Sequence, residues 1–269
     1  MSWNKSVTAE AVVQRLQETQ GLYSYCNRSY DGFVEKGATS VRRPKLPTLV
    51  VKKNTGTASS SADRKKTKTD TVMVETDLDV YAVPILDEIA GKFESNDLLR
   101  NEFVISATGQ IQEQFDADVI VAAQTTTQVQ NMAGSTLAWD DITLVSKVFN
   151  QNKVPKQNRI IIVSANLEQE FWNVDVIKNA ASYNQVTLSS GKFVEVMGMR
   201  FFISGLVPQI TGKDNIVGIY GPGLAFILSR FVEIKETYDP ELLADSIDLL
   251  AHAAAELDDD KFAVVVKKV

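Results

Sequence analysis

The chain has 269 residues, of which 44% are hydrophobic and 23% charged, proportions typical of a folded protein. It contains one cysteine, Cys26, and one histidine, His252, which argues against disulfides, zinc sites and histidine-based triads and favours folding in a reducing cytoplasm. The net charge is −6, yet residues 1–68 carry 13 Lys and Arg against 5 Asp and Glu, and the remainder carries 15 against 29. No apolar run approaches the roughly 18 residues of a membrane span, and no secretory signal is evident, so we expect no membrane partner.

The N-terminal region predicts a short helix followed by an arm. Residues 8–18 have the spacing of a short amphipathic helix. Residues 21–37 then mix aromatic with polar side chains and show no clear period. We expect this segment to be an extended arm that needs another surface on which to pack.

A long hairpin is predicted next. Residues 39–52 have the composition of a strand, but Pro44 and Pro47 cannot donate to a ladder, so the strand lies at an edge or in a free ribbon. Residues 54–69 are polar and of low complexity, which indicates a flexible tip. The return strand alternates, with these residues on one face: Val72, Val74, Thr76, Leu78 and Val80. Because an isolated hairpin is marginal in water, we expect it to lie on a neighbouring subunit.

One long helix follows the hairpin. Apolar residues recur every four positions and predict a helix from about residue 97 to about residue 123, roughly 40 Å long. Gly109 weakens this helix locally without ending it. The stripe consists of Leu99, Phe103, Ala107, Ile111, Phe115 and Val119.

The rest of the chain predicts a compact α/β region and late strands. Asp140 is expected to cap a helix that stops before Pro155, and the apolar run Arg159–Val163 is typical of a strand buried on both faces. The further elements expected, in chain order, are short helices at Leu167–Trp172 and Asp175–Ala181, a hairpin of Phe193–Val196 and Met199–Ser204, a strand at Ile216–Tyr220, a helix at Leu224–Ser229, and strands at Phe231–Tyr238, Ser246–Leu257 (which could be helical) and Phe262–Lys267.

The charges suggest candidate contact residues. The basic excess is concentrated at Arg42, Arg43, Lys45, Lys52, Lys53, Arg64, Lys65, Lys66 and Lys68. The acidic excess is densest at Glu233, Glu236, Asp239, Glu241, Asp245, Asp248, Glu256 and Asp258–Asp260. Copies of the chain could attract each other, basic segment to acidic face, or these could be two solvated surfaces that never meet. The basic segment 42–68 also permits a nucleic-acid-binding protein, although no aromatic residue in its tip can stack on bases.

No motif for catalysis or cofactor binding is found. Phosphate-binding loops, nucleophile elbows, zinc-protease motifs and Cys-x-x-Cys are absent. The pairs Asp77/Asp79 and Asp116/Asp118 could hold a metal and so leave a carboxylate–metal enzyme as an alternative, but such pairs are more often solvated. We therefore expect no catalytic residue, no cofactor and no metal site, with Cys26 and His252 in structural positions.

The order of these parts resembles a known family. In this chain, the opening strand of the hairpin is VRRPKLPTL (Val41–Leu49), and the return strand and long helix follow across Asp79–Phe103 and Gln112–Gln124. A central strand and helix at Asn158–Asn173 and a late hairpin at Val194–Pro208 come after them. Together they resemble the major capsid proteins of tailed bacteriophages, which have the Hong Kong 97 fold. The resemblance spans nearly the whole chain.

The resemblance implies an α+β fold with an N-terminal arm, a long hairpin called the E-loop, a spine helix in a peripheral domain, and a central α/β axial domain. The implied boundaries are 1–38 for the arm, 39–84 for the E-loop, 85–125 for the peripheral domain with the spine helix, 126–230 for the axial domain, 231–260 for peripheral return strands, and 261–269 for the last axial strand.

It further implies a shell subunit that forms hexamers and pentamers through E-loop and arm contacts. The basic residues from Arg42 to Lys68 would meet Glu233, Glu236, Asp239 and Glu241 of a neighbour. The expected location is the virion, after assembly in the host cytoplasm, with a portal, a separate scaffolding protein and non-specific proximity to packaged double-stranded DNA. The last asparagine is Asn215, so the late peripheral strands offer none for a covalent cross-link. Encapsulin compartments share this fold and are the alternative.

Overall fold

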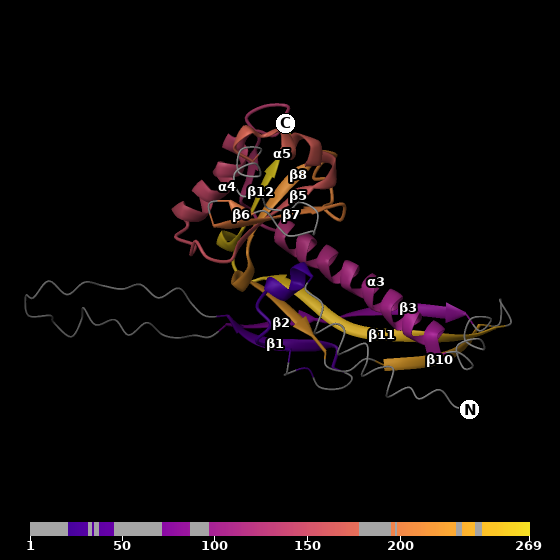
Figure 1. Cartoon of the computed structure of the whole chain (residues 1–269). Coiled ribbons are helices and arrows are strands. Elements are labelled where there is room, and N and C mark those ends of the chain that lie inside the picture. The colour runs from indigo at the N-terminus through magenta and orange to yellow at the C-terminus, as the bar shows by residue number, and fades with distance from the viewer. Residues whose placement is uncertain are drawn as a thin grey trace, which may run out of the picture.

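The structure, a computed structural model, describes residues 21–31, 34, 38–45, 72–86, 97–177, 195–196, 198–229, 233–239 and 244–269. These residues form two lobes joined by one long helix, with a two-stranded ribbon at one end of the lower lobe (Figure 1). A six-stranded sheet forms the upper lobe and a four-stranded sheet forms the lower lobe. The fold is therefore α+β, as predicted.

The long helix α3 (Asp97–Gln124) has 28 residues and connects the lobes (Figure 1). Over the part whose side chains the structure describes, the predicted apolar stripe is the buried face, since Ala107, Ile111, Phe115 and Val119 are each at most 2% exposed. Because Gly109 lies on the exposed side, it interrupts none of this packing. The prediction of one long helix from about residue 97 is confirmed.

The four-stranded sheet is organised around one long strand, β11 (Ala244–Leu257), of 14 residues. β3 (Asp79–Leu86) pairs antiparallel along one edge of β11. β10 (Glu233–Asp239) and β9 (Leu224–Leu228) pair antiparallel with successive parts of the other edge. α3 covers one face of this sheet (Figure 1).

The six-stranded sheet has the order β4-β12-β8-β5-β7-β6. Its strands are β4 (Val129–Asn131), β5 (Arg159–Ser164), β6 (Glu195–Val196), β7 (Met199–Ser204), β8 (Asn215–Tyr220) and β12 (Ala263–Lys267). The helices α4 (Trp139–Gln151) and α5 (Glu168–Asn173) pack on one face, and the C-terminal end of α3 reaches the other. Short 3-10 turns lie at Leu22–Tyr25 (η1), Ala165–Leu167 (η2), Gly221–Gly223 (η4) and Asp260–Phe262 (η5).

Both faces of the six-stranded sheet belong to hydrophobic cores. In β5, Ile160 and Ile162 point toward α3, whereas Ile161 and Val163 point toward α4 and α5. All six residues of β5 are buried. This arrangement explains why the run is apolar without alternation, and the prediction of a strand buried on both faces is confirmed.

Two local predictions are wrong. The predicted helix at Leu224–Ser229 is strand β9, in which all five residues are buried; a short run that is apolar throughout carries no period to separate helix from strand. The carboxylate that caps α4 is that of Asp141 and not of Asp140. Its Oδ2 accepts the N–H of Ala138 and its Oδ1 accepts the N–H of Ala133, both at 2.9 Å.

The alternating run that begins at residue 72 is also divided differently from the prediction. β2 (Val72–Asp77) and β3 are separate strands on either side of Leu78, and Val80 is 57% exposed although Leu78 is buried. β3 begins inside the implied range of the hairpin and β9 lies inside that of the axial domain, and both strands pair with β11. The domain boundaries themselves stay predictions. Among the helices in the described ranges, none combines the length and apolar content that a membrane crossing requires.

Candidate assembly surface at the base of the ribbon

The β1–β2 ribbon forms a sheet of its own. β1 (Ser40–Lys45) and β2 pair antiparallel, from Ser40 opposite Asp77 to Lys45 opposite Val72. Within the described residues, neither strand pairs with the four-stranded sheet. The N–H of Leu78 donates to the carbonyl of Thr39 (2.9 Å) and closes the ribbon at its base. The two strands of the predicted hairpin are thus paired as expected, while the segment between them lies outside the described part of the chain.

A small apolar cluster attaches the base of the ribbon to the lower lobe. Val41 of β1 and Leu78 contact Val34, Ile227 of β9 and Ala254 of β11. All five residues are buried. The alternation of β1 and β2 produces this contact, because the face that carries Val41 also carries the next inward residue, Arg43.

Arg43 is the buried cation of the ribbon. Its side chain is bound on three sides: Nη2 pairs with the Glu256 carboxylate (2.8 Å), Nη1 pairs with the Asp258 carboxylate, and Nε donates to Thr76 Oγ1 (3.1 Å). Thr76 Oγ1 in turn donates to Glu256. Arg43 is 4% exposed, so this network connects the ribbon to the end of β11 within one chain.

The chemistry of arginine suits this position. A planar guanidinium offers donors in a fixed fork, so it binds two carboxylates and a hydroxyl with defined geometry. Glu256 and Asp258 keep part of their hydration, with side chains 35% and 27% exposed. Removal of Arg43 would leave both carboxylates without their shared cation, and their partial hydration makes this less costly than it would be for a fully buried pair.

The opposite face of the ribbon is exposed and differently charged. Ser40 Oγ donates to Glu75 Oε1 (2.8 Å), and Arg42 Nη2 lies 3.4 Å from Glu75 Oε2. The Ser40 hydrogen bond, followed by the positive charge of Arg42, lowers the pKa of Glu75. On the same strand Met73 is 57% exposed. This face offers a salt-sensitive ion pair and an uncovered apolar side chain.

Residues 21–31 are bound to their own chain. The N–H of Tyr23 donates to Asp116 Oδ1 of α3 (3.0 Å), and Asn27 exchanges backbone hydrogen bonds with Leu224 and Phe226 of β9 (2.8 and 3.0 Å). Tyr23 is completely buried. The expectation that this segment needs another surface is therefore met, for residues 21–31, by the chain's own spine helix and sheet.

Comparisons with known proteins establish the fold. No family model matches the chain, and no curated protein matches it. Solved structures match over almost the full length. A structure from Mycobacterium phage Che8 has 18% identity and a TM-score of 0.59, covering 92% of this chain and 91% of that one.

Two further matches define the architecture. The capsid of Ralstonia phage GP4 has 8% identity and a TM-score of 0.62, covering 90% of this chain and 86% of that one. The SrpI encapsulin of Synechococcus elongatus has 11% identity and a TM-score of 0.57, covering 91% and 86%. The chain has the Hong Kong 97 capsid fold. At these identities the likeness concerns the fold alone.

The predicted contact residues fall into three groups: those whose side chains the structure describes, those of which it gives only the backbone position, and those outside the described residues. Arg42 lies on the exposed face of the ribbon, and Arg43 is engaged inside its own chain, which sequence reasoning missed. Of Lys45, Glu233, Glu236 and Asp239 the structure gives the backbone positions, in β1 and β10, which belong to different sheets. The remaining members lie outside the described residues: Lys52, Lys53, Arg64, Lys65, Lys66, Lys68 and Glu241. Contact between copies therefore stays a prediction.

Of the two acidic pairs, Asp116 and Asp118 hold neighbouring elements of the chain together. Asp116 accepts a hydrogen bond from the N–H of Tyr23, and Asp118 accepts one from the hydroxyl of Tyr81 on β3. Asp77 and Asp79 are exposed on either side of the break between β2 and β3. In the described part of the chain, no group of three or more His, Cys, Asp or Glu side chains could hold a metal ion.

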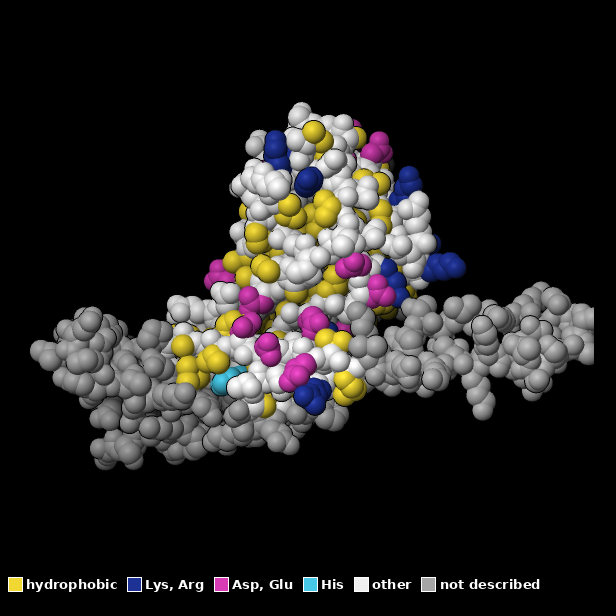
Figure 2. Space-filling view, turned by 180° about the vertical axis from the view of Figure 1, so that it is seen from behind, with side chains coloured by type: hydrophobic (Ala, Val, Ile, Leu, Met, Phe, Trp, Pro, Cys, Tyr) yellow, Lys and Arg dark blue, Asp and Glu magenta, His cyan; other side chains and the backbone are white. Residues whose placement is uncertain are grey.

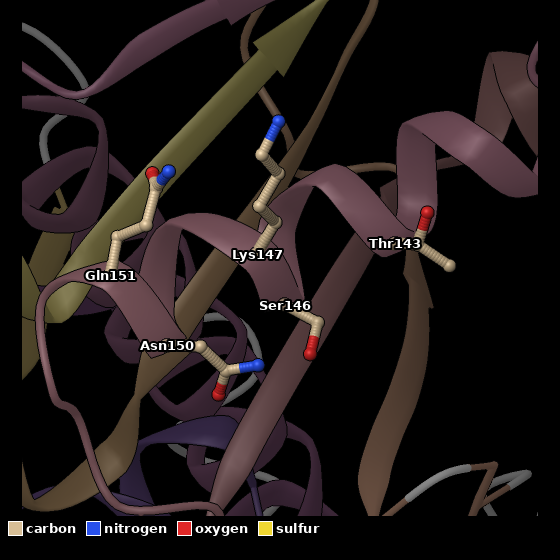
Figure 3. A pocket seen from close by; sticks show the side chains of 5 residues that line it. All are labelled: Thr143, Ser146, Lys147, Asn150 and Gln151. Carbon is tan, nitrogen blue, oxygen red and sulfur yellow. The ribbon is translucent and has the colours of Figure 1, made fainter.

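Two surface hollows offer no converging chemical groups. The first, about 450 Å³, is lined by five side chains of α4, namely Thr143, Ser146, Lys147, Asn150 and Gln151, and Figure 3 shows that all of them come from this one helix. The second, about 560 Å³, lies between the start of α4 and α5. It is lined by two carboxylates: Glu170 already binds Lys268 Nζ (2.8 Å) and the N–H of Leu137 (2.7 Å), and Asp175 is exposed to solvent.

Proposed function

We propose that the chain is the major capsid protein of a tailed bacteriophage and that its copies assemble into the icosahedral shell around the genome. The observation that carries this proposal is the fold, which the phage GP4 capsid shares over 90% of the chain. The role is structural. Neither the hollows nor the acidic pairs of the described residues bring together groups that could perform a reaction.

The ribbon supports a shell function on physical grounds. A two-stranded ribbon is marginally stable by itself in water, because its outer face buries little apolar surface. Here the base is fixed by the Arg43 network and the apolar cluster, whereas Met73 on the outer face remains 57% exposed. A neighbouring copy that covers this face would complete the burial, and a closed shell supplies such a neighbour for every subunit.

The charge distribution supports the same contact. The segment 42–68 is basic, and Figure 2 shows Asp and Glu side chains gathered on the lower lobe and at the narrow part between the lobes. In our proposal the basic segment of one copy lies over acidic residues of the next copy, with Glu233, Glu236, Asp239 and Glu241 as the predicted contacts. Each exposed pair contributes little, but the contact repeats at every subunit of the shell.

The proposal includes the partners expected of such a subunit. Hexamers and pentamers of the chain would form the shell, with a portal and a separate scaffolding protein, and packaged double-stranded DNA would lie close to its inner wall. The location would be the virion, after assembly in the host cytoplasm.

An encapsulin-like compartment is the second candidate, favoured by the match to the SrpI encapsulin. If the chain forms such a compartment, we expect particles that protect no nucleic acid from nuclease. A phage shell co-expressed with its packaging proteins encloses nuclease-resistant DNA. Nuclease treatment of purified particles followed by measurement of the protected nucleic acid separates the two.

The first experiment is negative-stain microscopy with light scattering of the purified chain across a salt series. Closed shells or tubes tens of nanometres wide support the shell function. The shell function is overturned if the chain stays monomeric both alone and with its scaffolding protein and binds a DNA probe with steep salt dependence. That result would favour a nucleic-acid-binding protein.

The proposed electrostatic attraction between the basic segment and the acidic residues of the next copy is tested separately. The test reverses the charges of Arg42, Lys52 and Lys53 and leaves Arg43 intact. We expect loss of assembly at low salt, where screening is weakest. Unchanged assembly at low salt removes electrostatic attraction from the account and leaves the apolar contact.

A further inference from the structure

The direction of the ribbon is not fixed by strand pairing. In the described residues, β1 and β2 pair only with each other, and the backbone bond from Leu78 to Thr39 closes their base without joining them to β11. Apart from the covalent link through Leu78 between β2 and β3, side chains therefore determine the angle at which the ribbon leaves the lower lobe.

Among the described residues, two side-chain contacts hold the ribbon, and they differ in kind. The first is the apolar cluster of Val41 and Leu78 with Ile227 and Ala254, and apolar contact has no directional preference. The second is Arg43, two residues farther along β1 than Val41 and so about 7 Å away along the strand. Its fork binds Glu256, Asp258 and Thr76 at once, which constrains both position and angle.

We propose that Arg43 is a positioning residue that sets the angle between the β1–β2 ribbon and β11, so that the ribbon is oriented before a second copy of the chain binds it. The apolar cluster acts as the pivot and the arginine fork as the second point that defines a direction. This inference rests on the proposed shell function for its consequence, since an oriented ribbon needs less ordering on assembly.

The substitution Arg43→Ala leaves the pivot intact but releases the second point. Glu256 and Asp258 then repel each other, and both are exposed enough to regain hydration, so we expect the lobes to stay folded. Arg43→Lys retains the charge but can bind one carboxylate at a time, so it restores the angle only in part. Arg42→Ala is the matched control, because the Arg42 side chain is 71% exposed and, among the described residues, pairs with Glu75 of the same ribbon.

The angle is monitored on unassembled subunits through the distance between two spin labels, measured by double electron–electron resonance. Labels are placed on Met73→Cys of β2 and Val121→Cys of α3, where the native side chains are 57% and 49% exposed; Cys26 is buried and stays unlabelled. We expect one narrow distance distribution in the parent protein and in Arg42→Ala, and a broadened or shifted one in Arg43→Ala. An unchanged distribution in Arg43→Ala, or an equal change in Arg42→Ala, overturns the proposal.

Two additional measurements keep the test decisive. If Arg43→Ala fails to fold by circular dichroism, the double variant Glu256→Ala with Asp258→Ala removes both carboxylate acceptors of the fork, at side chains that are 35% and 27% exposed, and must broaden the distribution. In assembly, Arg43→Ala should raise the critical subunit concentration by about tenfold, because an unoriented ribbon must be ordered on contact. If the parent chain does not assemble, the shell function fails, whereas the distance measurement still decides the role of Arg43.

Discussion

The ring of Phe115, in the middle of α3, meets the ring of Tyr23 edge to face, with centroids 5.7 Å apart and an interplanar angle of 79°. Phe115 also contacts Phe226 of β9 at 5.3 Å and Tyr81 of β3 at 5.0 Å. One completely buried side chain thus joins the spine helix to both edges of the four-stranded sheet and to the segment at residues 21–31.

Phe115→Ala should therefore destabilise the subunit strongly. Removal of a large buried ring leaves a cavity and costs about 3–5 kcal/mol of unfolding free energy. Urea denaturation of the unassembled subunit measures the loss. Val121→Ala is the control on the same helix, because Val121 is 49% exposed and its truncation should cost less than about 0.5 kcal/mol. Equal losses in the two variants would show that the Phe115 contacts are not part of the folded core.

Asp116 should make stability depend on pH. Burial raises its pKa, and the backbone N–H groups of Tyr23 and Leu22 oppose that rise only in part. Because the folded-state pKa lies above the unfolded value, this group contributes stability at low pH that is lost as pH rises through the raised pKa. Asp116→Asn keeps an oxygen that can accept from Tyr23 and cannot ionise.

The stability of Asp116→Asn relative to the parent should consequently increase across the range from about pH 4, where an ordinary Asp carboxyl ionises, to above the raised pKa. Denaturant titrations at several pH values in that range measure the difference. A difference that is constant with pH, or that moves toward the parent protein, contradicts the assignment. Asp118→Asn on the same helix is the variant to compare with Asp116→Asn, because the Asp118 carboxylate accepts from the hydroxyl of Tyr81 and not from a backbone N–H.

Two glycines should respond in opposite directions to alanine. A Cβ on Gly221 would lie 2.3 Å from the carbonyl oxygen of Tyr25, so Gly221→Ala must displace backbone and should cost about 1–3 kcal/mol. A Cβ on Gly109 of α3 meets nothing within 4 Å, so Gly109→Ala should stabilise the helix by about 0.5–1 kcal/mol. Thermal unfolding of both variants measures the pair, and a loss at Gly109 would contradict its exposed position.

The lone thiol should be inert in the folded subunit. Burial raises the pKa of Cys26 to about 12, so little thiolate exists at neutral pH. We expect no reaction with a disulfide reagent under native conditions and full reaction in denaturant. Rapid modification of the native protein at neutral pH would contradict the buried position of Cys26.

Periodicity predicted what repeats regularly along the chain. The four-residue spacing of Ala107, Ile111, Phe115 and Val119 identified α3, because a helix with one buried face leaves that pattern in the sequence. It failed at β9, where all residues are buried and no pattern exists. It also failed at Leu78, where the chain changes sheets and the buried face of the alternation changes with it.

The candidate site was predicted only in kind. Attraction between the basic segment and the acidic C-terminal region of another copy was expected. Arg43 instead pairs with the acidic residues Glu256 and Asp258 of its own chain. Its partner Asp258 is 215 residues away in sequence, and local patterns carry no information about a pairing that only the tertiary fold creates. The inward position of Arg43 follows from alternation with Val41, so a strict reading of the strand faces could have identified it as buried.

The position of β12 has a consequence for biosynthesis. β12 lies between β4 and β8, parallel to one and antiparallel to the other, although it follows every other described strand in the chain. During translation β4 and β8 therefore keep open edges until residues 263–267 have left the ribosome, and open strand edges are templates for pairing with other chains. A cell that makes many copies at once must keep its nascent chains apart until each has placed this strand.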